Sequence, residues 1–397
     1  MTPSENEKDQ VFALLLLLSR NIFTEEERIQ AEKSCRSLTG WKLFADLAVR
    51  HGVAALVWQN ITDLDLTETV PEPERDLPEN IRFKTIARVS YITSVAAEVV
   101  EELEKEGIRA LLLKGLALEH SVYGSRGLRQ MSDADLLVAP EDAIRARDIL
   151  IKAGFISRPM KSSLYRHIIF DLGNHLPELH RSGISVDLHH RLFGPEGMEI
   201  VRRALDSPEA ISVAGRTYYV LPPGIALLGL INHIFKHEIK GEFQLRLYTD
   251  IYLLLKKDGG MIFSRNLLAD AEQAGISGGL RTVLTILNKF YGIDIPPECI
   301  ALEGAEQEKV AAFRDNLLEP GQAKPQSPKD LFLENLRSLR GLRRKLIFIA
   351  GDIFPSVEFM KNRYGCSTAF SALLRYPHRL GKILWVINPI LPKYLHK

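Results

Sequence analysis

The chain has 397 residues, of which 46% are hydrophobic and 25% are charged, and its formal net charge is +1. This composition is typical of a folded, soluble protein and excludes an intrinsically disordered one, and the length predicts two or three subdomains. The charge is uneven, because residues 331–397 hold twelve Lys and Arg against three Asp and Glu, whereas the rest of the chain is mildly acidic.

Residues 1–78 are predicted to form a helical N-terminal region. The apolar run at residues 11–18 has no basic segment before it and is too short to span a bilayer, so it indicates a buried helix. Thr24 and Glu27 have the spacing of a capping box, which predicts the start of another helix. No stretch reaches transmembrane length, and we expect no stable insertion into a membrane.

Prolines at positions 71, 73 and 78 are expected to end this region. A long amphipathic helix is predicted from about residue 79 to residue 106, with Gly107 as its C-cap. The hydrophobic period then changes, and the apolar run at residues 108–113 predicts a buried strand that ends at Lys114 and Gly115.

Residues 79–215 are predicted to hold the β-sheet of the protein. The further elements expected in this segment are a helix at 116–123, a loop at 124–130, a strand at 133–138, a helix at 140–153 and a hairpin of strands at 175–180 and 184–190. This order predicts an α+β fold, in which a small mixed β-sheet core is flanked by mainly helical N- and C-terminal regions.

The remainder of the chain is predicted to be helical. We expect a helical domain at residues 216–318, a linker at 319–328 and a basic helical segment at 329–397. The three cysteines, at positions 35, 299 and 366, lie far apart without CxxC spacing. A zinc site or a disulfide framework is therefore not expected, and a reducing cytoplasm is the favoured location.

Asp133 and Asp135 are the most informative pair of residues in the sequence. They stand at the start of an apolar run, and on a strand their side chains project from the same face. Two like charges this close favour a cation between them. An isolated match of this kind is more often a solvated strand end, but the apolar residues 136–138 that follow make an unpaired acid pair costly and favour a divalent-metal site.

Two further sequence features, a lysine-glycine turn and a third acidic residue, add to the predicted metal site. Lys114 and Gly115 lie at a strand-to-helix turn, where glycine permits close approach of backbone to a phosphate and the helix N-terminus offers free N–H groups. Asp187 alternates with apolar neighbours on a later strand and shares a face with His189. A third carboxylate there completes a cage for Mg²⁺, which proteins hold through few carboxylates together with substrate phosphates.

This arrangement resembles the nucleotidyltransferase superfamily typified by DNA polymerase beta, in which a glycine-containing turn precedes a D-x-D strand and a later strand supplies a third acid. More narrowly, LLLKGLALEHSVYGSRGLRQMSDADLLV at residues 111–138, followed by VDLHHRLF, is similar to the bacterial family usually called uncharacterised nucleotidyltransferases. The resemblance covers residues 10 to 260, and its specific part is residues 108–192. One departure is Leu116, where the superfamily has Ser or Gly, and the distance from Gly115 to Asp133 is also longer than usual.

The resemblance implies a metal-dependent enzyme that transfers an NMP from an NTP, ATP included, to a small molecule, protein or RNA and releases pyrophosphate. It implies that Mg²⁺ or Mn²⁺ is held by three catalytic carboxylates, which are Asp133, Asp135 and Asp187. The nucleotide-binding residues that it implies are Lys114, Gly115, Ser132 and Arg129.

Several weaker patterns have ordinary explanations. His233 and His237 have metal-pair spacing on a predicted helix, although core or surface histidines are the favoured interpretation. Arg246 and Asp250 are expected to form an ion pair on a helix surface. Arg126 is as well explained by a solvated loop as by phosphate binding.

Basic residues also gather near the end of the chain, at Arg340, Arg343, Arg344 and Lys345. Binding of nucleic acid through them is not favoured over a solvated helix face or docking onto the acidic body. Two other functions stay open. One is a catalytically weak or inactive protein that binds nucleotide or acts as a scaffold, and the other is a toxin-like enzyme that modifies tRNA.

Overall fold

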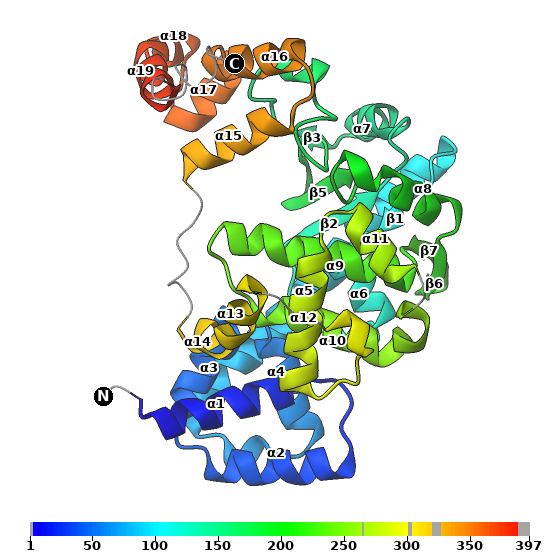
Figure 1. Cartoon of the computed structure of the whole chain (residues 1–397), viewed down its shortest axis with the longest axis vertical. Helices are drawn as coiled ribbons and strands as arrows, with labels where there is room; N and C mark the ends of the chain where they lie inside the picture. Colours follow the sequence, from blue (N-terminus) through cyan, green and yellow to red (C-terminus); the bar gives the residue numbers. More distant parts are fainter. Residues whose placement is uncertain (1–2, 264–265, 301–303, 320–326, 388–397) are drawn as a thin grey trace.

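The computed structural model describes residues 3–263, 266–300, 304–319 and 327–387. A mixed β-sheet occupies the middle of the molecule, the N-terminal helices lie at one end, and the C-terminal helices lie at the other (Figure 1). The α+β fold predicted from the sequence is confirmed.

The N-terminal helices are α1 (Glu5–Leu18), α2 (Glu25–Ser37), α3 (Trp41–Arg50), α4 (Ala54–Asp63) and, after the 3-10 turn η1 (Thr67–Thr69), α5 (Glu72–Lys105). The capping box that opens α2 is present, and α5 ends one residue before Glu106, with Gly107 at φ +74°. The long helix begins at Glu72 instead of about residue 79, so that only Pro71 of the three prolines precedes it. Pro71 is the N-cap of α5 and Pro73 lies in its first turn, where no intrahelical N–H is needed. Pro78 lies inside the helix but is buried against α3 and α4.

In the described residues the sheet has seven strands, in the order β3-β4-β5-β2-β1-β7-β6. The strands are β1 (Leu111–Leu112), β2 (Asp133–Leu137), β3 (Ile156–Ser157), β4 (Leu179–Arg181), β5 (Ile184–His189), β6 (Glu209–Val213) and β7 (Arg216–Val220). β2 pairs with β5 in parallel and with β1 antiparallel, and β1 pairs with β7 in parallel. The expected hairpin is confirmed as β4 and β5, although residues 175–178 add only a bridge from His175 to His189.

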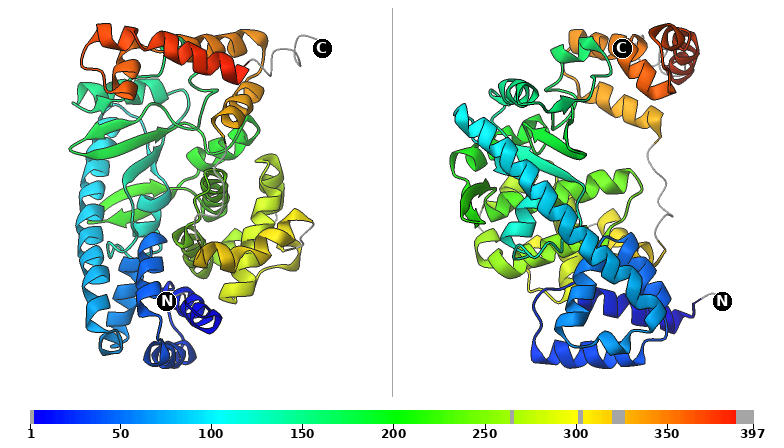
Figure 2. Two further views of the ribbon diagram at one scale, coloured as in Figure 1. Left: turned by 90° about the vertical axis from the view of Figure 1, so that its left-hand side faces the viewer. Right: turned by 180° about the vertical axis from the view of Figure 1, so that it is seen from behind.

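The two faces of the sheet belong to different hydrophobic cores. Leu112 and Leu136 face the core that contains one side of α5, which runs along the sheet (Figure 2). Leu111 and Leu137 point the other way, into the larger core built with the N-terminal helices and the helices that follow the sheet. Because side chains alternate along a strand, Asp133 and Asp135 project from the same face as Leu137.

Further helices surround this sheet and complete the chain. Those within the sheet segment are α6 (Lys114–Ser121), α7 (Ala143–Lys152), η2 (Ser163–His167), η3 (Pro195–Gly197) and α8 (Met198–Asp206). Those after it are α9 (Pro223–Ile239), α10 (Leu245–Ile262), α11 (Leu267–Gln273), α12 (Ser277–Ile286), η4 (Leu287–Tyr291), η5 (Pro297–Cys299), α13 (Ala305–Ala311) and α14 (Phe313–Leu318). Within the ranges that the structure describes, no helix combines the length and hydropathy needed to cross a bilayer.

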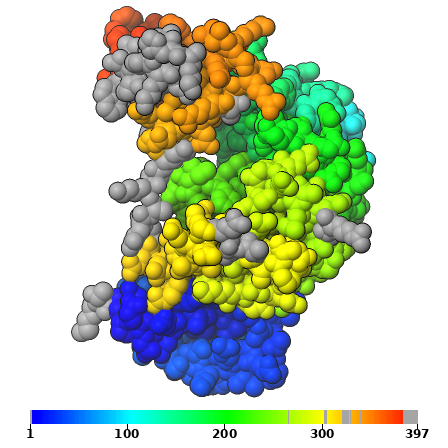
Figure 3. Space-filling view, in the orientation of Figure 1, coloured from blue at the N-terminus to red at the C-terminus, as the bar shows by residue number. Residues whose placement is uncertain are grey.

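The C-terminal helices are α15 (Pro328–Ser338), α16 (Leu342–Ile353), α17 (Val357–Tyr364), α18 (Ala369–Leu373) and α19 (Tyr376–Ile387). They project at one end of the molecule, and the surface beneath them is hollowed (Figure 3). The rings of Phe348 and Tyr165 stack at 5.9 Å between α16 and η2. Arg340 and Arg344 pair with Glu196 and Asp171, so two of the basic residues dock onto the acidic body.

The expected division into domains stays a prediction, and most of the expected linker, residues 320–326, lies outside the described residues. Strands β6 and β7 were not predicted, and they form one hairpin across the expected boundary at 215/216. Their turn, Ala214-Gly215, has positive φ at both residues, as a two-residue hairpin turn requires. All three cysteines are free, as expected.

Candidate active site

Two neighbouring strands carry the acidic residues of the candidate site. Asp133 begins β2 and Asp135 follows two residues later, so their side chains share a face. β5 runs parallel to β2, and Asp187 lies directly opposite Asp135 in the register. His189 follows Asp187 by two residues and extends the same face. The alternation read from the sequence therefore places these four polar side chains together.

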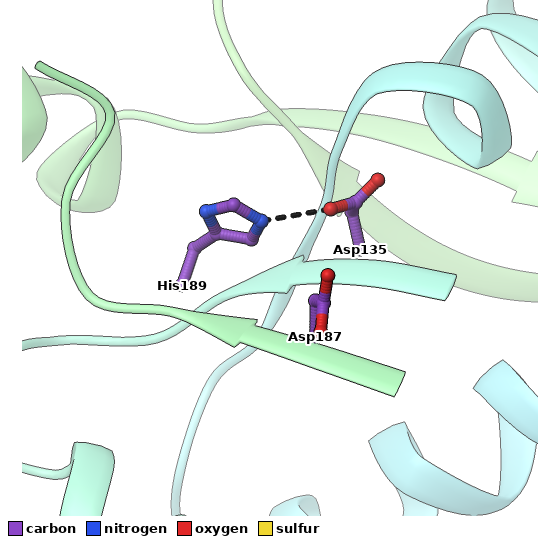
Figure 4. Close-up of side chains that lie close together, drawn as sticks. All are labelled: Asp135, Asp187 and His189. Atoms are coloured by element: carbon purple, nitrogen blue, oxygen red, sulfur yellow. Dashed lines mark hydrogen bonds and ion pairs between the residues drawn. The ribbon is translucent and has the colours of Figure 1, made fainter. Parts of the chain in front are cut away.

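Three of these residues form a group of potential metal ligands. Asp135, Asp187 and His189 each offer one ligand atom, and these atoms lie within 4.8 Å of one another (Figure 4). His189 Nε2 lies 2.7 Å from Asp135 Oδ1. Asp133 is not part of this group; it is half-buried and accepts a 3.3 Å hydrogen bond from the exposed Ser132 hydroxyl. Two carboxylates and an imidazole form a donor set suited to a divalent cation.

Lys114 is the cation that contacts this group in the structure. Its Nζ lies 2.6 Å from Asp135 Oδ1 and 3.4 Å from His189 Nε2. Lys114 is the first residue of α6 and has a φ of +47°, a left-handed conformation that costs a non-glycine residue about 1–2 kcal/mol. The strained turn thus directs the ammonium group toward the carboxylate cluster.

The three carboxyl groups differ in how easily they ionise. Burial opposes the ionisation of Asp135, but Lys114 and His189 outweigh it and hold its pKa well below the usual range. Burial and the charge of Asp135 raise the pKa of Asp133. Burial, together with the neighbouring carboxylates, raises the pKa of Asp187 to about 6, although His175 acts in the opposite direction. One carboxylate is therefore fixed as an anion, while two lack sufficient positive charge nearby.

The charge of the Asp187 carboxylate is the least compensated of the three. Its Oδ1 is buried, and no hydrogen-bond partner for it exists among the described residues. The ring nitrogen Nδ1 of His175 lies 3.8 Å away, beyond hydrogen-bond distance. Burial also lowers the pKa of His189 to about 4, so this imidazole is neutral at pH 7 and supplies no positive charge to the cluster.

Gly115 is explained by its contact with Arg129. A Cβ built on Gly115 would overlap the Arg129 Nη1 atom and lie 2.9 Å from its Cζ. Arg129 is 5% exposed and pairs with Asp250 through two contacts, Nη2–Oδ2 at 2.7 Å and Nε–Oδ1 at 3.2 Å. A nucleotide contact by Gly115 or Arg129 stays a prediction.

Asp250 is the centre of this second buried cluster. It is completely buried, and the Tyr123 hydroxyl donates a 2.9 Å hydrogen bond to its Oδ1. Glu119 accepts the backbone N–H of Arg129 at 2.9 Å and so fixes the loop before β2. The expected surface ion pair between Arg246 and Asp250 is wrong, because Asp250 faces the interior while Arg246 donates to the Gln130 carbonyl and to Gln244.

A cavity of about 340 Å³ connects the site to α9. Its lining includes Lys114, Asp133, Asp187 and His189. Gly115, Ser132 and Arg129 are not among the described residues that line it. The opposite wall is a face of α9. The α9 residues that line the cavity together with Lys240, the C-cap of that helix, are Pro223, Ala226, Gly229, Leu230, Asn232, His233, Lys236 and His237.

The two histidines of α9 therefore line the cavity instead of packing in the core or lying on the outer surface. His237 Nε2 and His233 Nε2 are 3.2 Å apart, and His237 Nδ1 lies 2.6 Å from Glu242. Arg126 pairs with Asp63 at 2.6 Å on the surface.

Sequence reasoning did not assign His189, Lys236 or Asp250 to the site or its support. The alternation on β5 was the available signal for His189. The spacing of basic residues on α9 was the signal for Lys236. No local pattern indicates that Asp250 pairs with Arg129, because the two residues are 121 positions apart.

Comparison with known proteins adds one finding. None of the curated proteins matches the chain. The sequence profile of the family described as uncharacterised nucleotidyltransferase matches residues 37–292, which is more than half of the chain and contains the sheet, the carboxylate cluster and α9. The chain therefore belongs to the uncharacterised nucleotidyltransferase family.

Proposed function

We propose that this protein is a metal-dependent nucleotidyltransferase that moves an NMP from an NTP to the hydroxyl group of an acceptor. The observation that carries the proposal is the register between β2 and β5, which sets Asp135 opposite Asp187. Asp133, Asp187 and His189 line the adjoining cavity. Membership in the family supports the same reaction class.

The residues of the cluster fit a divalent cation. The buried Asp187 Oδ1 has no hydrogen-bond partner in the described structure, with His175 Nδ1 3.8 Å away, and an acidic oxygen without a hydrogen bond is costly unless a cation binds it. Asp133, Asp135 and Asp187 offer the oxygen ligands that Mg²⁺ and Mn²⁺ prefer, and His189 adds an imidazole. When bound, such a cation supplies neutralisation of the charge on the phosphates.

The protein side chains have the following roles in this proposal. Lys114 keeps Asp135 ionised, so that this ligand is available at all physiological pH values. Asp187 accepts the proton of the acceptor hydroxyl, whose oxygen forms a bond to the α-phosphorus of the NTP. The bond from that phosphorus to the bridging oxygen of the β-phosphate breaks, and pyrophosphate leaves. Positioning and electrostatics carry most of the catalysis in such a reaction.

The test is transfer of radioactive label from an NTP that carries ³²P at the α-position. The purified protein is incubated with Mg²⁺ or Mn²⁺ and a cell extract that supplies small molecules, proteins and RNA. We expect label in one acceptor class with the α-labelled NTP and none with the γ-labelled NTP, because the β- and γ-phosphates leave as pyrophosphate.

Asp133→Asn is the matched loss-of-function variant, and Asp148→Asn on the exposed face of α7 is its control. The first should reduce transfer strongly, and the second should leave it unchanged. Metal-dependent binding of NTP without transfer by the wild type would support a nucleotide-binding protein without catalysis. Transfer into RNA alone would identify a tRNA-modifying, toxin-like enzyme, and absence of NTP binding with either metal would refute the proposal.

A further inference from the structure

Four basic side chains lie on one side of α9. His233, Lys236, His237 and Lys240 are spaced by three, one and three residues, which places them along one face at the end of the helix. All four line the cavity that also contains Asp133 and Asp187. The light-green residues of α9 border the hollow in the surface (Figure 3). A basic wall therefore faces the carboxylate cluster across one cavity.

The two ammonium groups of this wall have no partner among the described residues, whereas His237 contacts Glu242. The side chains of Lys236 and Lys240 form no hydrogen bond or ion pair with another described residue, although the Lys240 backbone N–H donates to the His237 carbonyl. The acidic residue next to them, Glu238, is outside the cavity lining and accepts from Tyr248 at 3.3 Å and Lys309 at 3.4 Å. Lys236 is accessible to solvent, as a residue on a cavity wall is, yet the protein around it still lowers its pKa.

The lowered pKa of Lys236 has two causes, burial and neighbouring positive charges. Burial, with further contributions from Lys114, Arg191 and Lys240, lowers the pKa of Lys236 to about 8. Three neighbouring cations thus act on it, and the carboxylate of Asp135 offsets them only in part. A cluster of like charges without counter-ions is unfavourable in the free protein, and an anion with several charges would relieve it.

The turn at Lys114 and Gly115 supplies less free positive charge. Lys114 is already paired with Asp135, and the space beside Gly115 is filled by the guanidinium of Arg129, itself paired with Asp250. Within the described lining of the cavity, the unpaired ammonium groups are those of α9.

From this arrangement we infer that the α9 face formed by His233, Lys236, His237 and Lys240 binds the β- and γ-phosphates of the NTP and holds the departing pyrophosphate. The assignment of this anion to an NTP rests on the proposed function, whereas the affinity for a polyphosphate does not. The α-phosphate then lies between this wall and the carboxylates of β2 and β5, where transfer occurs. The two lysines contribute the charge, and the neutral imidazoles, which contact each other and Glu242, form the wall between them.

The test is calorimetric titration with inorganic tripolyphosphate in the presence of EDTA, so that no metal contributes. We expect binding by the wild type, and a loss of about tenfold in affinity for each of Lys236→Gln and Lys240→Gln, which corresponds to loss of one charge-assisted hydrogen bond each. Lys33→Gln removes an exposed lysine on α2 and should bind like the wild type. Lys236→Arg should retain most of the affinity, and circular dichroism verifies that all variants fold.

Unchanged binding in the Lys236→Gln/Lys240→Gln variant, or no binding of tripolyphosphate by the wild type, would overturn the inference. The Asp133→Asn variant distinguishes the inference from the proposed function. It should lose NMP transfer but bind tripolyphosphate at least as well as the wild type. If the wild type binds tripolyphosphate through α9 but transfers no label, the inference stands and the proposed function fails. If the wild type transfers label and the double variant has an unchanged KM for NTP, the inference fails alone.

Discussion

Two clusters of buried acidic residues adjoin each other at Lys114 and Gly115, and they differ in how their charge is balanced. Asp250 has both oxygens bonded, to Arg129 and Tyr123. Asp187 is mostly buried as well, yet its Oδ1 has no hydrogen-bond partner among the described residues, and His175 Nδ1 lies 3.8 Å from it. The first cluster is complete within the protein. The second leaves an acidic oxygen without a hydrogen bond, and in the proposed function a cation from outside binds there.

The largest effect on folding is expected from Asp250→Asn. The substitution leaves the buried guanidinium of Arg129 without its counter-ion, and breaking such a pair costs about 3–5 kcal/mol. Urea unfolding in the presence of EDTA measures this loss, with Asp148→Asn as the exposed control. A loss below about 1 kcal/mol would show that the Asp250 cluster is not the supporting structure described above.

The largest effect on activity is expected from Asp135→Asn. It removes the carboxylate whose pKa Lys114 and His189 hold well below the usual range, and we expect the rate of NMP transfer to fall by about 10²–10³-fold. Steady-state kinetics with the α-labelled NTP measure kcat/KM, and circular dichroism controls for folding. Activity within a factor of about two of wild type would mean that the geometry of the cluster serves another purpose.

Gly115→Ala distinguishes two explanations of the turn. Because the guanidinium of Arg129 is held by Asp250, it cannot move away from an added methyl group, and we expect a loss of about 1–3 kcal/mol in unfolding free energy. The same urea measurement applies. If Gly115 only gives access to a phosphate, stability stays unchanged and only the KM for NTP rises.

Asp187→Asn should increase the free energy of unfolding, whereas Asp250→Asn and Gly115→Ala should decrease it. The pKa of Asp187 is raised above its ordinary 3.8 to about 6, so its contribution to stability is fully present below pH 3.8 and is lost as the pH rises through about 6. At pH 8 without metal, the variant removes this penalty and should be more stable by about 1–2 kcal/mol. Denaturation at pH 8 and pH 4 tests this, because the gain should vanish at pH 4. A variant that is less stable at pH 8 would contradict the assigned imbalance.

The sequence predicted the part of the site that depends on local periodicity. Asp133, Asp135 and Asp187 were found because a strand alternates its side chains and because apolar neighbours mark it as buried. The register that sets Asp135 opposite Asp187, and the parallel pairing of β1 with β7, depend on packing between distant segments. No local pattern indicates such contacts.

The balance of charge was equally beyond sequence reasoning. Arg129 was expected at a phosphate but lies against Asp250, and Asp250 was expected to pair with its helical neighbour Arg246. Both depend on which face of α10 is turned inward. Nucleotide contacts by Lys114, Gly115, Ser132 and Arg129 and a cytoplasmic location stay predictions.

The most direct test of the account is the affinity of the metal-free protein for Mn²⁺, measured by electron paramagnetic resonance at pH 7.5. The account predicts that the wild type and Asp148→Asn bind Mn²⁺ equally, and that Asp187→Asn loses about tenfold or more in affinity although it folds more stably. Equal affinity of Asp187→Asn and the wild type, or no binding of Mn²⁺ by the wild type, would contradict the claim that this unbalanced cluster is a cation site.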